Sequence, residues 1–228
     1  MKKAVLILLI FCSGITFAQL VTLNKVERTS ENKDAFLYKI TPDLPSAIYL
    51  GEIAVSGFSE NDAEVFGLVY KKAKSIGANA FAWKPAPQID DKISSFQPAD
   101  YQLSLYYLPA DQFPAEGNVV YLLGDAGKQQ TISLNKRTVS IPARSYISFT
   151  LPAGGPVTVS TRKLFGSSIK LGASRDQPVQ YFQISGFSVN ANQGPGINLK
   201  SGDIIKLEKS YGQFLTTIYS YLNQEISP

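Results

Sequence analysis

Two Ser-x-x-Lys quartets are the first groups in this sequence with residue types suited to covalent chemistry. They are Ser30-Glu31-Asn32-Lys33 and Ser167-Ser168-Ile169-Lys170. In penicillin-recognising enzymes a helix start holds such a serine beside its lysine, and Ser-Asp-Asn and Lys-Thr-Gly motifs complete the site. Neither motif occurs in this chain, and Ser167 lies in a predicted β region. Both quartets are therefore interpreted as chance matches.

Paired carboxylates would suit glycoside hydrolysis, which needs one protonated and one ionised acid beside the scissile bond. The candidate acids are Glu52, Asp62, Glu64, Asp90 and Asp91. The helix acids are explained by capping and by the helix dipole, and the loop acids by solvation. The spacing of Asp90, Asp91 and Asp100 matches no known calcium site. A hydrolase of envelope glycans stays open as the alternative function.

The residue inventory excludes several other chemistries. The 228-residue chain has no histidine, and its one cysteine and one methionine are Cys12 and Met1. A chain that has lost those two residues with a leader has no Ser-His-Asp triad, no thiol nucleophile, no disulfide and no thiolate or imidazole zinc site. We therefore expect no enzyme, no bound metal and no cofactor.

Aromatic and basic side chains are the better candidates for binding. The rings that could stack on a sugar are those of Trp83, Tyr106 and Tyr146. The alternative for Trp83 and its neighbour Phe81 is that both form core beneath a helix. The candidates for contact with an anionic partner are Arg137, Arg144, Arg162, Lys163, Lys170 and Arg175.

The basic surface has several possible partners. It could meet an anionic envelope glycan, another envelope protein, the acidic half of the same chain, or only solvent. Nucleic acid is not expected, because few aromatic residues are interleaved with these charges.

The first 18 residues are typical of a secretory signal peptide. Residues 1–3 are basic at two positions, residues 4–12 are apolar, and residues 16–18 precede Gln19 as a small-residue cleavage site. The apolar run is too short to span a bilayer, and no later segment approaches the ~20 apolar residues of a membrane helix. We expect a secreted or periplasmic protein, cleaved near Ala18-Gln19, without an integral membrane segment in the mature chain.

The remainder divides into two parts of opposite charge. Residues 19–116 carry 13 acidic and 9 basic side chains, whereas residues 117–228 carry 5 acidic and 11 basic ones. A Pro-bearing stretch without periodicity lies between them. The predicted division is a signal peptide over 1–18, a small α/β domain over 19–108, a linker over 109–117, and a β-sandwich domain with a C-terminal helix over 118–228.

One helix organises the first domain. Ser59 and Asp62 form a Ser-x-x-Asp capping box, apolar residues recur at helical spacing as far as Ile76, and Gly77 is the expected stop. Strand composition precedes and follows this helix, in the order βαββ. These strands are predicted over 47–55, 79–83 and 101–108.

The end of this helix also carries a resemblance. Residues 70–80, Tyr-Lys-Lys-Ala-Lys-Ser-Ile-Gly-Ala-Asn-Ala, resemble the helix-to-strand junction of small envelope βαβ domains. Those domains include the Rcs stress-sensor lipoproteins and a family described as heavy-metal-binding. The sensor's structural cysteines and any soft metal ligand are absent here, so the resemblance implies the fold alone.

The second domain has short alternating segments separated by Gly, Pro and Asn, typical of a β-sandwich. Residues 146–151 and 157–162 are expected to form a hairpin, and apolar residues over 211–222 predict a helix that packs on the sandwich. The fold class is therefore α+β: a small α/β (βαββ) domain, then an antiparallel β-sandwich with a C-terminal helix. The predicted sandwich strands are 119–123, 131–134, 138–141, 146–151, 157–162, 179–187 and 204–208.

Two local resemblances fall in this domain. Leu151-Pro152-Ala153-Gly154 is similar to a turn of PEGA-like extracytoplasmic β-sandwich domains, although Gly155-Pro156 replaces the usual Lys-His. Residues 200–212 are similar to a strand of the GroES co-chaperonin family, which would imply a cytosolic chaperonin partner that the leader contradicts. The sequence thus favours a non-catalytic binding or structural protein of the cell envelope, with the glycan hydrolase as alternative and a co-chaperonin-like protein as a remote one.

Overall fold

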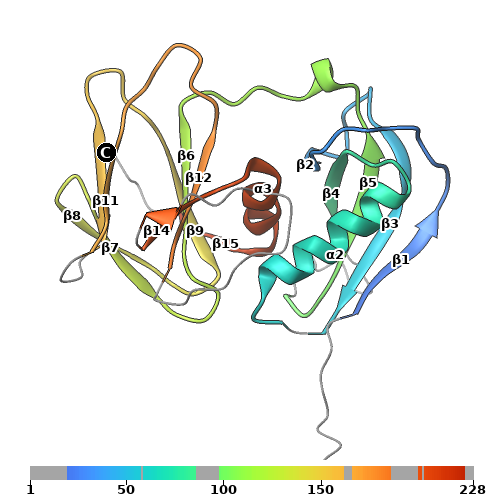
Figure 1. Ribbon diagram of the computed structural model, residues 1–228, viewed down its shortest axis with the longest axis horizontal. Coiled ribbons are helices and arrows are strands. Elements are labelled where there is room, and N and C mark those ends of the chain that lie inside the picture. Colours follow the sequence, from blue (N-terminus) through green and yellow to red (C-terminus); the bar gives the residue numbers. More distant parts are fainter. Residues whose placement is uncertain are drawn as a thin grey trace, which may run out of the picture.

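The described residues form three β-sheets and two α-helices, which confirms the α+β class (Figure 1). The computed structural model describes residues 20–57, 59–85, 98–161, 166–185, 200–201 and 203–223. The predicted signal peptide and four of the residues singled out above lie outside these ranges. Those four are Asp90, Asp91, Arg162 and Lys163.

The first half of the chain forms a five-stranded sheet that carries one long helix. The helix α2 (Asp62–Ser75) connects two strands that are parallel to each other, because each pairs antiparallel with the strand between them. This is a split βαβ unit. Two further strands, absent from the predicted βαββ order, complete the edges. The strand order is β1 (Leu20–Val26), β3 (Ile48–Ser56), β5 (Asp100–Tyr107), β4 (Ala80–Lys84) and β2 (Tyr38–Lys39).

The ends of α2 follow local chemistry, with one correction to the prediction. Asn61, not Ser59, is the N-cap: its side-chain oxygen accepts the backbone N–H of Glu64 at 3.2 Å, while the Ser59 hydroxyl accepts the N–H of Asn61. Gly77 ends the helix as predicted. Its φ is +79°, and a Cβ there would lie 1.8 Å from the Ser30 carbonyl oxygen, so only glycine fits without rearrangement.

The second half forms a sandwich of two sheets. Two strand pairs of the larger sheet, β6 with β12 and β9 with β15, are parallel, so this sheet is mixed rather than purely antiparallel. The larger sheet has the order β13 (Lys200–Ser201), β14 (Ile204–Leu207), β12 (Gln180–Ile184), β6 (Val119–Leu123), β9 (Ser145–Thr150) and β15 (Ser220–Tyr221). The smaller has the order β11 (Ser168–Leu171), β10 (Val157–Thr161), β7 (Gln130–Leu134) and β8 (Arg137–Ile141).

The hairpin predicted around residues 152–156 does not form. β9 pairs with β6 and β15, whereas β10 pairs with β7 and β11, so residues 152–156 carry the chain from one sheet to the other. Ile147 and Val159 belong to the same hydrophobic cluster, which fills the core between the two sheets. Alternating hydrophobicity fixes which side chains face inward and leaves open whether two strands pair in one sheet or face each other in two.

The C-terminal helix α3 (Lys209–Ile218) lies between the two halves (Figure 1). It packs on β2 and α2 as well as on β12, so the prediction that it packs on the sandwich accounts only for its contact with β12. Phe214 is fully buried, with ring centroids 5.3 Å from Phe66 and 6.5 Å from Phe81. One hydrophobic core therefore runs from the five-stranded sheet through α3 to the six-stranded sheet.

Candidate functional site

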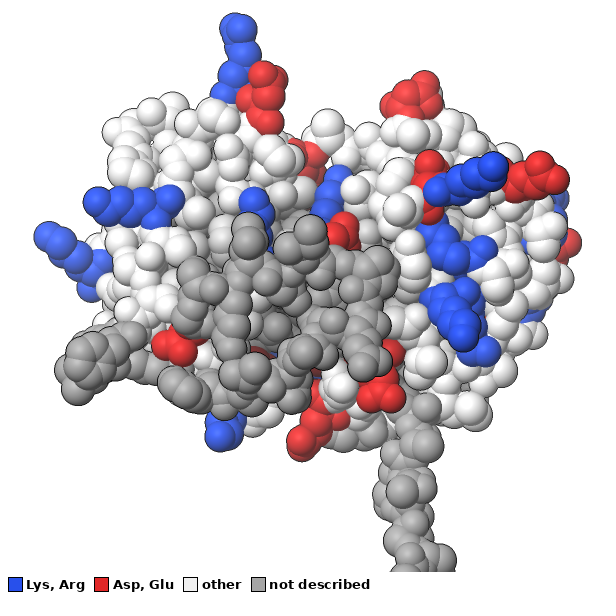
Figure 2. All heavy atoms as spheres, in the orientation of Figure 1, with Lys and Arg blue, Asp and Glu red and all other residues white. Residues whose placement is uncertain are grey.

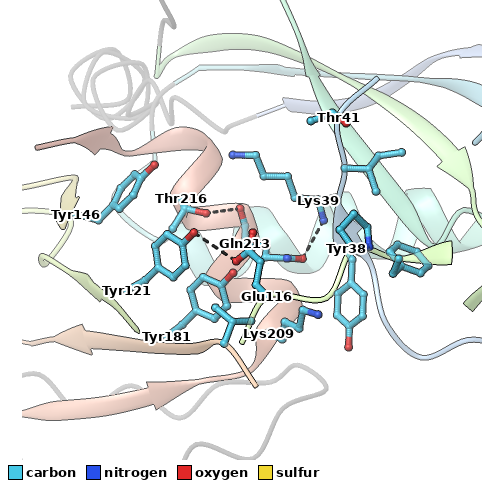
Figure 3. A pocket seen from close by; sticks show the side chains of 14 residues that line it. Tyr38, Lys39, Thr41, Glu116, Tyr121, Tyr146, Tyr181, Lys209, Gln213 and Thr216 are labelled. Atoms are coloured by element: carbon cyan, nitrogen blue, oxygen red, sulfur yellow. Dashed lines mark hydrogen bonds between the residues drawn. The ribbon is translucent and has the colours of Figure 1, made fainter. Parts of the chain in front are cut away.

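A cavity of about 260 Å³ lies where the two halves and their connection meet; we call it the tyrosine cavity (Figure 3). One wall is the outer face of the six-stranded sheet, the opposite wall is β2 with the two residues after it, and α3 forms the base. Phe113, Pro114 and Glu116 of the connection complete the lining. The cavity is therefore lined by segments that are far apart in the sequence.

Three tyrosines on neighbouring strands give the cavity its character. Tyr181 of β12 lies directly beside Tyr121 of β6 in the parallel register, and their rings stack with centroids 4.9 Å apart. Tyr146 of β9 follows at 6.0 Å from Tyr121. Tyr181 is buried, while Tyr121 and Tyr146 are half-buried. These rings point outward because their neighbours Val120 and Leu122 fill the core of the sandwich.

The opposite wall supplies polar groups. Gln213 of α3 accepts the backbone N–H of Lys39 at 2.9 Å, which ties β2 to the helix. The Lys39 side chain then extends across the cavity towards Thr216 and Tyr146 (Figure 3). The Lys209 ammonium lies 4.2 Å from the ring centroid of Tyr38, a cation–π contact at the rim.

The electrostatics of the cavity follow from its partial burial. Burial lowers the pKa of the Lys39 ammonium, and Glu116 opposes this effect. Burial raises the pKa of Tyr121 to about 12, helped by Glu116, whose carboxylate lies 3.5 Å from the Tyr121 hydroxyl. The pKa of Tyr146 and Tyr181 is raised as well, mainly by burial. All three hydroxyls are therefore protonated at neutral pH and can donate hydrogen bonds.

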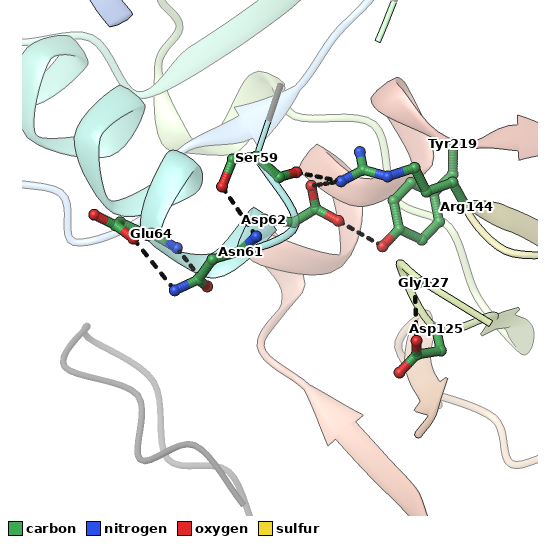
Figure 4. Close-up of polar contacts among 8 residues, drawn as sticks. All are labelled: Ser59, Asn61, Asp62, Glu64, Asp125, Gly127, Arg144 and Tyr219. Atoms are coloured by element: carbon green, nitrogen blue, oxygen red, sulfur yellow. Dashed lines mark hydrogen bonds and ion pairs between the residues drawn. The ribbon is translucent and has the colours of Figure 1, made fainter. Parts of the chain in front are cut away.

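A second polar group joins the halves elsewhere, and we call it the Asp62 cluster (Figure 4). Asp62, at the start of α2, is 5% exposed. It pairs with Arg144 at 3.0 Å and accepts the Tyr219 hydroxyl at 2.7 Å, and Arg144 also donates to the Ser59 carbonyl at 2.5 Å. Burial raises the pKa of Asp62, although Arg144 and Tyr219 both act to lower it. Polar groups from three segments that are distant in sequence thus bind one another.

The predicted basic surface is not a single face. Arg144 belongs to the Asp62 cluster, so it serves the interface between the halves rather than an outside partner. Arg137 on β8 and Lys170 on β11 are exposed at opposite edges of the four-stranded sheet, and Arg175 is exposed in a loop. Figure 2 shows the positive side chains of the sandwich half scattered, whereas the denser group in this view lies over α2.

The three predicted aromatic candidates also lie apart. Tyr106 is buried edge-on against Tyr49, with centroids 5.7 Å apart, so it cannot present its ring to a ligand. Trp83 is half-buried on β4, where its neighbour Phe81 is fully buried core. Tyr146 alone lines the tyrosine cavity.

Sequence reasoning missed the other residues of this site. Tyr121 and Tyr181 occupy outward positions in predicted strands, so the alternation of these strands predicts the side of the sheet that the two rings face. No local pattern, however, places their strands next to each other. Lys39 lies in a two-residue strand, too short to produce a strand pattern.

The remaining candidate chemistry is accounted for by structural contacts. Ser167 accepts the backbone N–H of Asp203 at 2.9 Å, and Lys170 of the same quartet lies on a strand, not on the helix that the motif requires. Glu52 accepts hydrogen bonds from Lys84 and Tyr49, both at 2.6 Å. In the described ranges, no group of three or more acidic, histidine or cysteine side chains is placed to hold a metal ion.

No protein family, no curated protein and no solved structure matches this chain. Among the residues that the structure describes, no helix combines the length and the apolar character needed to cross a membrane.

Proposed function

We propose that this is a secreted or periplasmic, non-catalytic binding protein of the cell envelope, and that the tyrosine cavity is its ligand site. The observation that carries the proposal is the row of Tyr181, Tyr121 and Tyr146 along one wall, opposite a wall of polar side chains. Aromatic side chains with a hydroxyl combine a large contact area with a hydrogen-bond donor, which suits recognition of sugars. An envelope glycan is therefore the proposed partner.

The same cavity does not favour the alternative of a glycan hydrolase. Such an enzyme needs two carboxyl groups about 5 to 10 Å apart across the scissile bond. Among the described residues that line the cavity, Glu116 is the one carboxylate. Asp62 and Glu52 are held by other residues away from it.

Binding of the mature chain to purified envelope polysaccharide tests the proposal. Co-sedimentation with insoluble sacculi should retain the protein, and Tyr146→Leu should reduce the retained fraction, because it removes a ring that faces the cavity. Tyr70→Leu is the matched control, since Tyr70 is half-buried on α2 outside the cavity. Equal retention of both variants, each shown folded by circular dichroism, would contradict the assigned site.

The compartment has its own test. The mass of the exported protein should correspond to a chain that begins at Gln19. A mature product that retains Met1 would contradict the envelope assignment.

A further inference from the structure

The charged groups of the tyrosine cavity differ in how far they are already paired. Lys209 lies over the Tyr38 ring, and Glu116 is within 3.5 Å of the Tyr121 hydroxyl. No hydrogen bond or ion pair joins the Lys39 ammonium to another residue in the described part of the chain. Lys39 is thus a cation that extends into the cavity without a partner among the described residues (Figure 3).

Lys39 is exposed on β2, and its side chain lines the cavity, so a ligand can reach the ammonium. The cavity walls shield the ammonium from part of the solvent, which lowers its pKa. An anionic ligand group would suit this ammonium, because a charge-assisted hydrogen bond is stronger than a neutral one. The backbone of Lys39 is already held by Gln213, so its side chain starts from a fixed strand position.

The groups around Lys39 indicate what else the ligand carries. Tyr146 and Tyr121 offer half-buried rings and protonated hydroxyls, which suit the CH groups and hydroxyls of a sugar ring. The cavity of about 260 Å³ is smaller than the range of roughly 300–1,000 Å³ found for drug-sized ligands, so it suits one sugar residue. A free inorganic anion would leave the aromatic wall without a contact.

We propose that the tyrosine cavity binds a carboxylate-bearing sugar residue, with the Lys39 ammonium on the carboxylate and the Tyr121 and Tyr146 side chains against the ring. This inference rests on the proposed function and names the ligand class of the same site. No catalytic step is involved, and Lys39 is a binding residue.

The test compares short acidic and neutral sugars on the mature chain by calorimetry. The probes are oligogalacturonate, a neutral gluco-oligosaccharide of equal length, and inorganic phosphate. Oligogalacturonate should bind at least about tenfold more tightly than the neutral sugar, the effect of one charge-assisted hydrogen bond. Lys39→Met should remove that preference and leave the neutral sugar unaffected. Lys206→Met is the control, because Lys206 is exposed on β14 outside the cavity.

The outcomes separate the two proposals. If neither sugar binds the wild-type chain, the proposed function fails. If both sugars bind equally and Lys39→Met changes neither, the sugar site stands and the acidic ligand is overturned. If inorganic phosphate binds as tightly as oligogalacturonate, the site accepts any anion and the sugar assignment is overturned.

A second variant keeps the test independent of the Lys39 substitution. Glu116→Gln removes the negative charge that raises the pKa of Lys39. Because this charge also repels an acidic ligand, the variant should bind oligogalacturonate more tightly relative to the neutral sugar. Weaker binding of the acidic sugar in a folded Glu116→Gln variant would contradict the assigned role of Lys39.

Discussion

The Asp62 cluster and the tyrosine cavity both lie between the two halves of the molecule, yet they differ in what their polar groups contact. In the cluster, Asp62, Arg144 and Tyr219 bind one another, and the carboxylate is buried. In the cavity, the Lys39 ammonium has no hydrogen bond or ion pair among the described residues, and the Tyr121 hydroxyl makes a 3.5 Å contact to the exposed Glu116. Groups that satisfy one another hold a fold together, whereas groups held apart are available to a ligand. Substitutions should therefore affect stability at the cluster and binding at the cavity.

Arg144→Met should have the largest effect on stability. It leaves the Asp62 carboxylate buried without its cation, and breaking a buried ion pair costs about 3–5 kcal/mol. Urea unfolding followed by circular dichroism at pH 7 measures the loss. Arg137→Met is the matched control, because Arg137 is exposed on β8, and its unfolding midpoint should equal that of the wild type.

The loss in free energy of unfolding caused by Arg144→Met should also become smaller as the pH falls from 7 to 5. Arg144 acts to lower the pKa of Asp62, whereas burial raises it. Without Arg144, the pKa of Asp62 should therefore be higher than in the wild type. A carboxyl whose pKa is higher in the folded than in the unfolded state takes up its proton in the folded state first, and this favours folding as the pH falls. In Asp62→Asn the remaining Arg144 guanidinium does not titrate, so the stability loss of this variant should not become smaller as the pH falls. Equal pH profiles for the two variants would rule out the assigned titration of Asp62.

Gly212→Ala should destabilise the contact between α3 and the six-stranded sheet. A Cβ at Gly212 would lie 2.2 Å from Cγ of the buried Tyr181, so the helix or the ring must move. Overpacking of this kind costs about 1–3 kcal/mol. Gly67→Ala is the control: Gly67 lies inside α2, and apart from its two chain neighbours and the nearby backbone of its own helix no described atom lies within 4 Å of the position of an added methyl group. This substitution should stabilise the helix by about 0.5–1 kcal/mol. Thermal unfolding of both variants gives the comparison.

Removal of a single tyrosine hydroxyl at each of the two sites compares them most directly. Tyr219→Phe removes a 2.7 Å hydrogen bond to the buried Asp62 carboxylate and should cost about 1.5–3 kcal/mol at most. Tyr121→Phe removes only a 3.5 Å contact to the exposed Glu116 and should leave the unfolding midpoint unchanged. A larger loss for Tyr121→Phe than for Tyr219→Phe would reverse the distinction between the cluster and the cavity.

Much of the local structure was predictable from the sequence. The apolar period over residues 62–76 predicted α2, and Gly77 predicted its end. Alternation predicted seven of the strands in the second half and the inward side chains of β9 and β10. These features depend on neighbours within a few residues, so the sequence carries them directly.

The candidate site was far less predictable. Among the described residues that the sequence indicated as binding candidates, Tyr146 alone lines the tyrosine cavity, while Arg144 is the cation of an internal ion pair. A basic residue next to a turn has the same local pattern whether it faces solvent or a carboxylate far away in the chain. The short strand of Lys39 has no pattern of its own.

The sequence by itself determined α2, most of α3 and the longer strands, together with the sides of them that are apolar, because backbone preferences and side-chain periods are local properties. The tertiary structure alone decided that β9 and β10 belong to different sheets, that α3 lies between the halves, and that Tyr121, Tyr146 and Tyr181 share one wall. Those arrangements depend on contacts between segments far apart in the chain, where burial of apolar surface selects among several pairings that the same local pattern permits.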